Sequence, residues 1–245
     1  MWAGLYGELT LARGPEAPSA DADVYKLFVA RSIAMGWLVD AARPRDAGLW
    51  GMNDASLAEP SSSSHGPAAW FQVVISDSAI AHAVLPTQPF LACVESVVAA
   101  HGVLDLRAVE MVLPPQRRSS RGRNPISLLA QAAGWYPAGT GTAVDISVEA
   151  AGSMSGHQPD VLRIVNSLPD SPFVCRSSSL SPLEGPPSAH GLEAWWGAPP
   201  TVRLVLRGTI AAWSLDAIGW TAGLVAHACH ESGVTTPIRL AATPA

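Results

Sequence analysis

The feature that most constrains the fold of this chain is an internal repeat. Residues 56–70 and 181–195 align without a gap and agree at seven of fifteen positions. The shared residues include a Glu, a His and a Trp as well as the commoner Ser, Gly and Ala, so the match is more than two similar Ser-rich compositions. A repeat of this kind predicts two units with the same supersecondary structure.

Weaker similarity extends the repeat in both directions. Upstream, a spacing of 137 residues aligns 7–14 with 144–151, and downstream a spacing of 131 aligns 71–103 with 202–234. In these blocks the chemical type of the residues agrees more often than their identity. The spacing changes between blocks, as expected where loops accept insertions.

Each copy predicts the order strand, helix, strand, strand, helix, strand. Apolar residues alternate with polar ones in the first strands, and the third strands are rich in β-branched residues. Asp21 or Asp23 and, in the second copy, Asp160 are the expected N-caps of the first helices. The strands are expected near 7–14, 48–50, 70–76 and 103–113, then near 144–151, 173–175, 201–206 and 234–242. The longest helices are expected at 87–101 and 214–231, ended by Gly102 and Gly233.

This order predicts an α+β fold of two tandem, duplicated ferredoxin-like (βαββαβ) units related by pseudo-two-fold symmetry. The first unit is expected at 1–113 and the second at 126–245, joined by a Pro- and Arg-rich linker at 114–125. A further helix is expected at 126–134. The two sheets could pack face to face or join edge to edge, and the sequence leaves both arrangements open.

The composition bounds the class of protein. Hydrophobic residues make up 48% of the chain and charged residues 14%, which allows a large core. The chain has no run of eighteen apolar residues, so we predict no membrane span. The first residues lack the pattern of a secretory signal. The three cysteines are odd in number and lie in apolar contexts, so we expect reduced thiols in a cytoplasmic protein. Fourteen arginines against one lysine, Lys26, indicate a GC-rich, actinobacteria-like bacterial genome.

The net charge of −5 disfavours nucleic acid as a partner. One basic cluster departs from this balance and could bind phosphate or an acidic partner, although a solvated linker explains it as well. It consists of Arg117, Arg118, Arg121 and Arg123.

The repeated Glu–His pairs are the candidate catalytic residues if the protein is an enzyme. A carboxylate beside an imidazole can orient it and raise its pKa, which makes a general base. The structural alternative is that His–Gly forms a turn and the Trp that follows anchors the next strand. The pairs are Glu59 with His65 and Glu184 with His190.

The remaining candidates are residues that could bind a partner, a small ligand or a metal ion. Trp70, Trp195 and Trp196 could bind a partner or a small aromatic ligand if they are exposed. His227, His230 and Glu231 share one face of a predicted helix, but the end of an amphipathic helix explains them better than a metal site. No phosphate loop, nucleophile elbow, CxxC or HExxH motif is present, so we predict no cofactor and no metal.

One segment resembles a known family. Residues 35–56, MGWLVDAARPRDAGLWGMNDAS, followed by a strand, AVLP and a helix up to residue 101, resemble the immunity protein 52 family of bacterial toxin systems. The second copy lacks the GW and LW-G elements of this pattern. The resemblance implies a cytoplasmic, non-catalytic binding protein that occludes a partner protein such as a toxin. The acidity of the chain would suit a basic nuclease.

Two alternatives remain open at this level. A small-molecule enzyme of the dimeric α+β-barrel type, a cofactor-free oxygenase or isomerase, would have its site between the two repeats. A structural subunit of a larger assembly would use sheet edges or the Arg-rich linker. The absence of a catalytic motif favours a protein that is not an enzyme.

Overall fold

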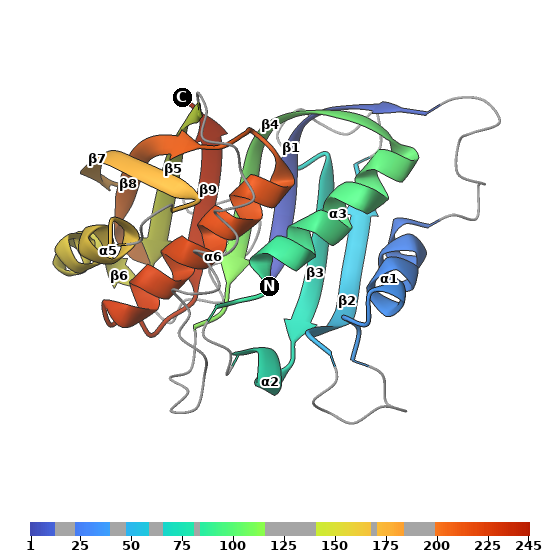
Figure 1. Ribbon diagram of the computed structural model, residues 1–245, viewed down its shortest axis with the longest axis horizontal. Helices are drawn as coiled ribbons and strands as arrows, with labels where there is room; N and C mark the ends of the chain where they lie inside the picture. Colours follow the sequence, from blue (N-terminus) through green and yellow to red (C-terminus); the bar gives the residue numbers. More distant parts are fainter. Residues whose placement is uncertain are drawn as a thin grey trace.

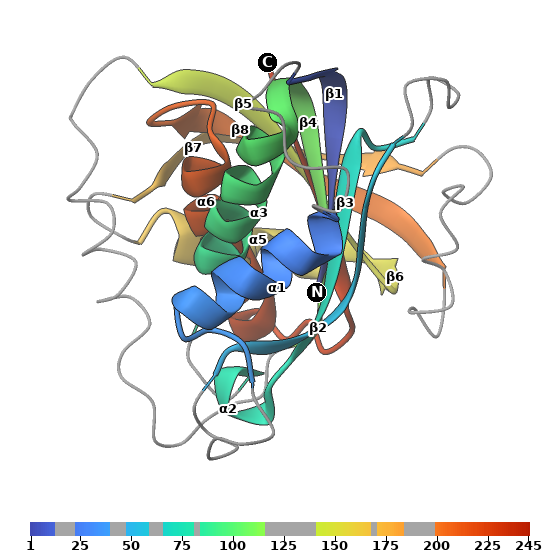
Figure 2. The same ribbon diagram turned by 90° about the vertical axis from the view of Figure 1, so that its right-hand side faces the viewer.

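The chain folds into one broad β-sheet that carries its helices on a single face (Figures 1 and 2). The computed structural model describes residues 1–12, 23–39, 48–58, 66–80, 84–115, 141–167, 171–183 and 199–245. Within these residues the sheet has nine strands, and all pairings are antiparallel except that of one short strand. The predicted α+β class is confirmed.

The elements follow the chain in two similar series. The first contains β1 (Trp2–Leu11), α1 (Val24–Ala34), β2 (Trp50–Leu57), β3 (Ala69–Ile75), α2 (Asp77–Ile80), α3 (Thr87–His101) and β4 (Gly102–Leu113). The second contains β5 (Thr142–Ala150), the short β6 (Gly152–Ser153), the 3₁₀ turn η1 (Met154–Gly156), α5 (Gln158–Val165), β7 (Phe173–Pro182), β8 (Pro200–Ile210), α6 (Leu215–Glu231) and β9 (Ile238–Pro244).

The two series meet edge to edge. The first four strands lie in the order β2-β3-β1-β4, and the second series in the order β9-β5-β8 with β7 paired to β8. Their junction is the antiparallel pairing of Val109–Leu113 in β4 with Ile238–Ala242 in β9. We call this pairing the seam. The sheet therefore passes from one series to the other without interruption.

The predicted spacing between the two first strands is wrong. At a spacing of 137, residues 7–11 of β1 match 144–148 of β5. Residues 144–148 pair with β8, whereas the described pairs between β1 and β3 involve only Trp2–Leu5. The segments aligned by sequence thus lie at different places along their strands. A slip by an even number of residues keeps every side chain on the same face, so the apolar alternation could not reveal it.

One predicted helix start is confirmed and one is wrong. Asp23 caps α1, because its side chain accepts a hydrogen bond from the Tyr25 amide at 2.9 Å. Asp160 does not cap α5: the N-cap position is His157, and Asp160 lies in the first turn, where it pairs with Arg163. Pro159 fixes this start, since proline suits the first turn of a helix.

The two glycines predicted to end the long helices differ in backbone conformation. Gly233 follows the C-cap of α6 with a φ of 98°, a left-handed conformation that favours glycine. Gly102 is the C-cap of α3 but has an extended φ of 166°, and β4 begins there without a loop. Strands β2 and β7 are also longer than predicted. Their small polar residues hid them from a pattern search.

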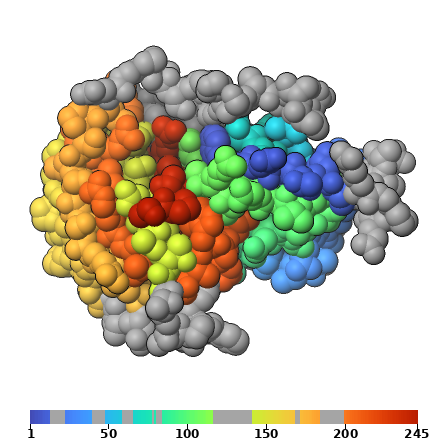
Figure 3. Space-filling model, turned by 90° about the horizontal axis from the view of Figure 1, so that it is seen from above, coloured from blue at the N-terminus to red at the C-terminus, as the bar shows by residue number. Residues whose placement is uncertain are grey.

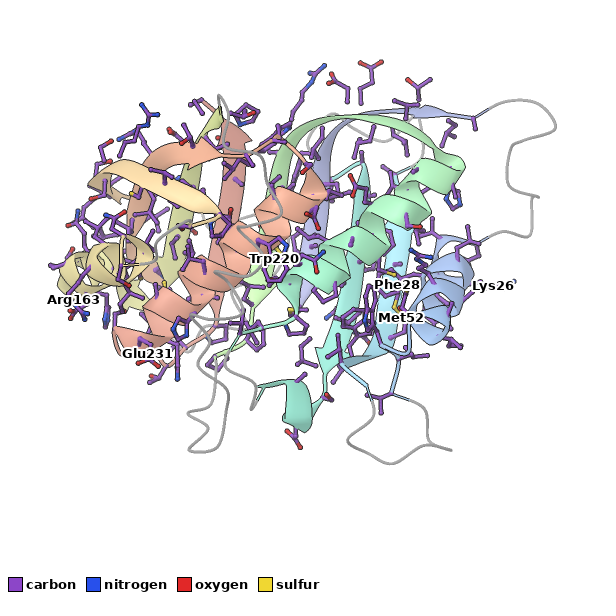
Figure 4. All side chains as sticks on the ribbon, viewed as in Figure 1. Lys26, Phe28, Met52, Arg163, Trp220 and Glu231 are labelled. Atoms are coloured by element: carbon purple, nitrogen blue, oxygen red, sulfur yellow. The ribbon has the colours of Figure 1, made fainter. Side chains whose placement is uncertain are left out.

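The core beneath the helices contains residues of both series in one cluster. In the first series an aromatic group packs between α1, α3 and the sheet, consisting of Phe28, Trp37, Trp50, Phe71 and Phe90. Phe28 points from α1 toward the sheet, as Figure 4 shows. The close ring contacts fix the distance between α1 and the sheet.

The three thiols are unpaired, and two of them are core residues as predicted. Cys93 and Cys229 are buried, whereas Cys175 is only partly buried. Burial raises the pKa of Cys93 to about 11 and that of Cys229 to about 12. Both buried thiols are therefore protonated and unreactive at neutral pH.

Helices α3 and α6 approach closely because α6 presents glycines to α3. The Thr87 hydroxyl donates to the Gly219 carbonyl oxygen at 2.8 Å, across the two series. A Cβ atom at Gly219 would lie 2.6 Å from the Cα atom of Gln88, and one at Gly223 would lie 2.9 Å from the Thr87 hydroxyl. Any side chain at Gly219 would therefore push the two helices apart.

We expect Gly219→Ala to destabilise the protein by about 1–2 kcal/mol. Alanine gains up to about 1 kcal/mol in helix propensity, but overpacking against main chain costs about 1–3 kcal/mol. Gly156→Ala is the matched control, because no atom lies within 4 Å of a Cβ placed there. Urea unfolding of both variants measures the difference, and equal stability would contradict the tight helix contact.

Candidate functional site

Most residues singled out in the sequence lie outside the described part of the chain. Those are the catalytic candidates Glu59, His65, Glu184 and His190, the binding candidates Trp195 and Trp196, and the cluster Arg117, Arg118, Arg121 and Arg123. They stay predictions. Among the predicted catalytic and binding residues, the structure describes only Trp70.

Trp70 belongs to a small apolar cluster on the sheet face opposite the helices, which we call the open face. It packs with Trp2 and Val112, both of which are buried. The Trp2 ring lies over Gly4, the residue that pairs with Trp70, and a Cβ at Gly4 would lie 2.4 Å from the ring. Trp70 is thus a partly buried residue that packs in this cluster, and its binding role stays a prediction.

The centre of the open face holds a network of charged residues at the seam. Arg239 of β9 donates to both carboxylate oxygens of Glu110 in β4, at 2.7 and 2.9 Å. It also donates to Glu149 of β5 at 3.3 Å. The Tyr6 hydroxyl donates to Glu110 at 3.2 Å. Arg239 therefore ties three neighbouring strands together.

The network is well shielded from solvent. The side chains of Glu110 and Glu149 are 7% and 6% exposed, and that of Arg239 is 22% exposed. Burial raises the pKa of Tyr6 well above its usual range, and the charge of Glu110 and the hydrogen bond to it add to the shift. Burial tends to lower the pKa of Arg239, but its contacts with Glu110 and Glu149 outweigh burial and raise it. Tyr6 stays neutral and Arg239 stays charged.

The protonation states of these groups favour a structural role for the network over a catalytic one. Tyr6 does not ionise near neutral pH, and Arg239 is engaged by two carboxylates. A buried charge is tolerated when it is paired and hydrogen-bonded. The sequence did carry a signal for the network, because Glu110, Glu149 and Arg239 each interrupt an apolar strand. It carried no signal for which strands are neighbours.

A groove on the helix side of the sheet is large enough for a small ligand. It has a volume of about 330 Å³ and lies between the second half of α3, the start of β4 and the residues that begin α6. Its lining is mainly apolar and consists of Glu95, Val98, Ala99, Gly102, Val103, Leu104, Leu106, Trp213, Ser214 and Leu215. By contrast, side chains fill the space between β5, β9 and α6, which leaves no volume for a water molecule.

The histidines near the end of α6 do not form a metal site with the neighbours that the structure describes. In that part of the chain, no group of three or more His, Cys, Asp or Glu side chains is placed to hold a metal ion. His227 is buried, and burial lowers its pKa; the nearby Glu231 partly opposes this shift. The His230 Nδ1 atom is also buried, without a hydrogen bond in the described structure.

The comparisons with known proteins find no relative. Neither protein-family models, nor curated proteins, nor solved structures match the chain. None of the described helices has the length and apolar character needed to cross a bilayer. The function must therefore be argued from the chain itself.

We expect Arg239→Met to destabilise the protein by about 3 kcal/mol at pH 7, because the buried Glu110 loses its ion pair with Arg239 and the buried Glu149 keeps only the more distant Arg203, at 3.8 Å. Arg163→Met is the control: Arg163 pairs with Asp160 at 2.9 Å, but both side chains are more than half exposed, so its loss costs less than about 0.5 kcal/mol. Denaturant unfolding measures both values. Losses of similar size would show that the seam network contributes no more than a surface pair.

We also expect His227 to make the protein sensitive to acid. Because its pKa is lowered in the folded state, the unfolded chain binds the proton first, and stability falls as the pH falls below about 6.5. His227→Gln should flatten this part of the curve of unfolding free energy against pH. An unchanged slope between pH 7 and pH 5 would contradict the assignment.

Proposed function

We propose that the protein is a non-catalytic binding protein, built from two diverged ferredoxin-like units, that recognises a partner protein through the outer side of α1. The order of elements and strands supports the duplication. Each series has the order β-α-β-β-α-β, apart from the short α2, β6 and η1. The strand order β2-β3-β1-β4 of the first series corresponds to the order β7-β8-β5-β9 of the second. Helices on one face of a four-stranded antiparallel unit are the ferredoxin-like arrangement.

The packed core beside the seam argues against an active site enclosed between the units. The seam strands are hydrogen-bonded to each other, α3 and α6 are in contact, and the space beside the seam is packed. An enzyme of the α+β-barrel type would need a cavity at this junction. Among the described residues, apolar side chains pack between β5, β9 and α6, and the Arg239 network lies on the open face. The space left where the two series meet is the groove between α3, β4 and the start of α6, which is open to one side.

Exposed apolar residues of α1 and its C-cap carry the proposal. Tyr25, Ile33 and Met35 are 37%, 53% and 43% exposed, although large apolar side chains usually pack inward. Ile33 lies seven residues after Lys26 and so shares its side of the helix. Figure 4 shows Lys26 pointing away from the sheet. Ile33 and Met35 lie two positions apart at the C-terminal end of α1, and exposed apolar residues gathered in one region commonly mark a protein interface.

The positive charge around this surface indicates which charge the partner's surface carries. Helix α1 contains Lys26 and Arg31, both exposed, and no acidic residue. The complementary surface is therefore apolar and edged by carboxylates. This local chemistry differs from the expectation of a basic partner, which rested on the net charge of the whole chain. An immunity protein that occludes a toxin is one binding protein of this kind, and the resemblance of residues 35–101 begins at the end of α1.

A comparison of matched variants tests the proposal. The tagged protein is used to capture partners from the source cell, and the recovered partner is then titrated against purified wild type and Ile33→Glu/Met35→Glu. We expect the double variant to bind at least about tenfold more weakly, because it places charge in an apolar contact and repels carboxylates. Both substituted residues are exposed, so the stability of the fold should change little.

Val174→Glu is the control, since Val174 is 55% exposed on β7, far from α1 (Figure 1). It should bind like wild type. Equal affinity of all three proteins would overturn the assignment of α1. The absence of any stoichiometric protein partner, or turnover of a substrate by the purified chain, would overturn the binding function itself.

A further inference from the structure

The groove beside α6 combines an apolar floor with acidic groups at one side. Leu104 and Leu106 of β4 form part of its wall, together with Val98 and Ala99 of α3. Figure 3 views this end of the molecule, where green residues of the first series lie against orange residues of the second. The groove thus forms only because the seam brings α3, β4 and α6 together.

The size of the groove suits a small molecule. Its volume of about 330 Å³ lies at the lower end of the range of ligand pockets. A cavity of about 150 Å³ already accepts benzene in another protein. An apolar body of one or two rings is therefore the size that the groove can take.

Two carboxylates give the groove a negative character. Glu95 lines it, and Asp216 lies next to the lining residue Leu215 in the first turn of α6. Burial raises the pKa of Glu95, and the charge of Asp216 raises it further. No hydrogen bond or ion pair holds the Glu95 carboxylate within the described residues, and the lining contains no Lys or Arg.

The other polar groups of the groove are already occupied. The Ser214 hydroxyl accepts from the Ala217 amide and so caps α6, while Asp216 accepts from Gln88. The Trp213 indole N–H donates to the Leu106 carbonyl oxygen at 2.8 Å, which holds its ring in the lining. Glu95 is the remaining charged group that can meet a ligand there. An aromatic ring beside a carboxylate is a favourable setting for an organic cation.

We propose that this groove binds a small organic cation whose apolar body lies against Leu104, Leu106 and Trp213 and whose ammonium group meets Glu95. The neighbouring carboxylate of Asp216 favours the cation and disfavours an anion by the same Coulomb interaction. The site does not depend on the proposed partner surface, because α1 contributes none of its lining.

Three matched ligands test the proposal on the purified full chain. They are 2-phenylethylammonium, the neutral 2-phenylethanol and the anionic phenylacetate, titrated at pH 7 by NMR with the Trp213 indole N–H as a reporter. We expect saturable one-to-one binding in the order cation, neutral compound, anion, with the cation bound at least about tenfold more tightly than the anion. Equal affinities, or shifts confined to another region, would overturn the site.

Two charge-matched variants separate the ammonium contact from general acidity. Glu95→Gln should weaken binding of the cation by about five- to tenfold and leave binding of 2-phenylethanol unchanged. Glu231→Gln removes one carboxylate at the other end of α6 (Figure 4) and should leave both unchanged. Unchanged cation binding in Glu95→Gln would overturn the proposal. The result is independent of whether α1 binds a partner, so failure of either proposal can be distinguished from failure of the other.

Discussion

The hydrogen-bonded seam between β4 and β9 is the interaction on which the rest of the structure depends. Each of these strands would otherwise be the edge of its own four-stranded unit, with unpaired main-chain groups open to association. Their pairing over Val109–Leu113 and Ile238–Ala242 removes both edges and makes one sheet. It also sets α3 against α6, closely enough for Thr87 to reach the Gly219 carbonyl. The shared core and the groove both follow from this contact.

The same pairing decides where charge can be buried. Arg239 is the direct cross-strand partner of Glu149 in β5 and the diagonal neighbour of Glu110 in β4. One guanidinium group therefore binds two carboxylates on the open face. A slip of two residues at the seam would keep the apolar side chains on the helix side. In one direction it would move Arg239 further from Glu110, which would weaken the pairing of a buried carboxylate. The network therefore disfavours a register that apolar packing alone would accept.

The packed core beside the seam leaves the candidate binding surfaces on the outside of the helices. One is the outer side of α1, where Ile33 is exposed on the same side as Lys26 and Met35 is exposed just after the helix. The other is the groove, where Glu95 of α3 belongs to a mainly apolar lining. Both surfaces lack an equivalent in the other unit: α5 carries a different set of residues, and the groove uses parts of both units. The two halves of the sheet therefore offer different surfaces on one framework.

Local signals along the chain were sufficient for much of the secondary structure. The limits of α3, the Asp23 cap and the alternation of Val144, Ile146 and Val148 could all be read from spacing, because they depend on residues close in sequence. The repeat likewise indicated the order of the elements, although not the register of β1 against β5. The seam, the partners of Arg239 and the groove could not be read in this way. Alternation tells which face of a strand is buried but not which strand lies beside it, and only the tertiary fold brings residues more than a hundred positions apart into contact.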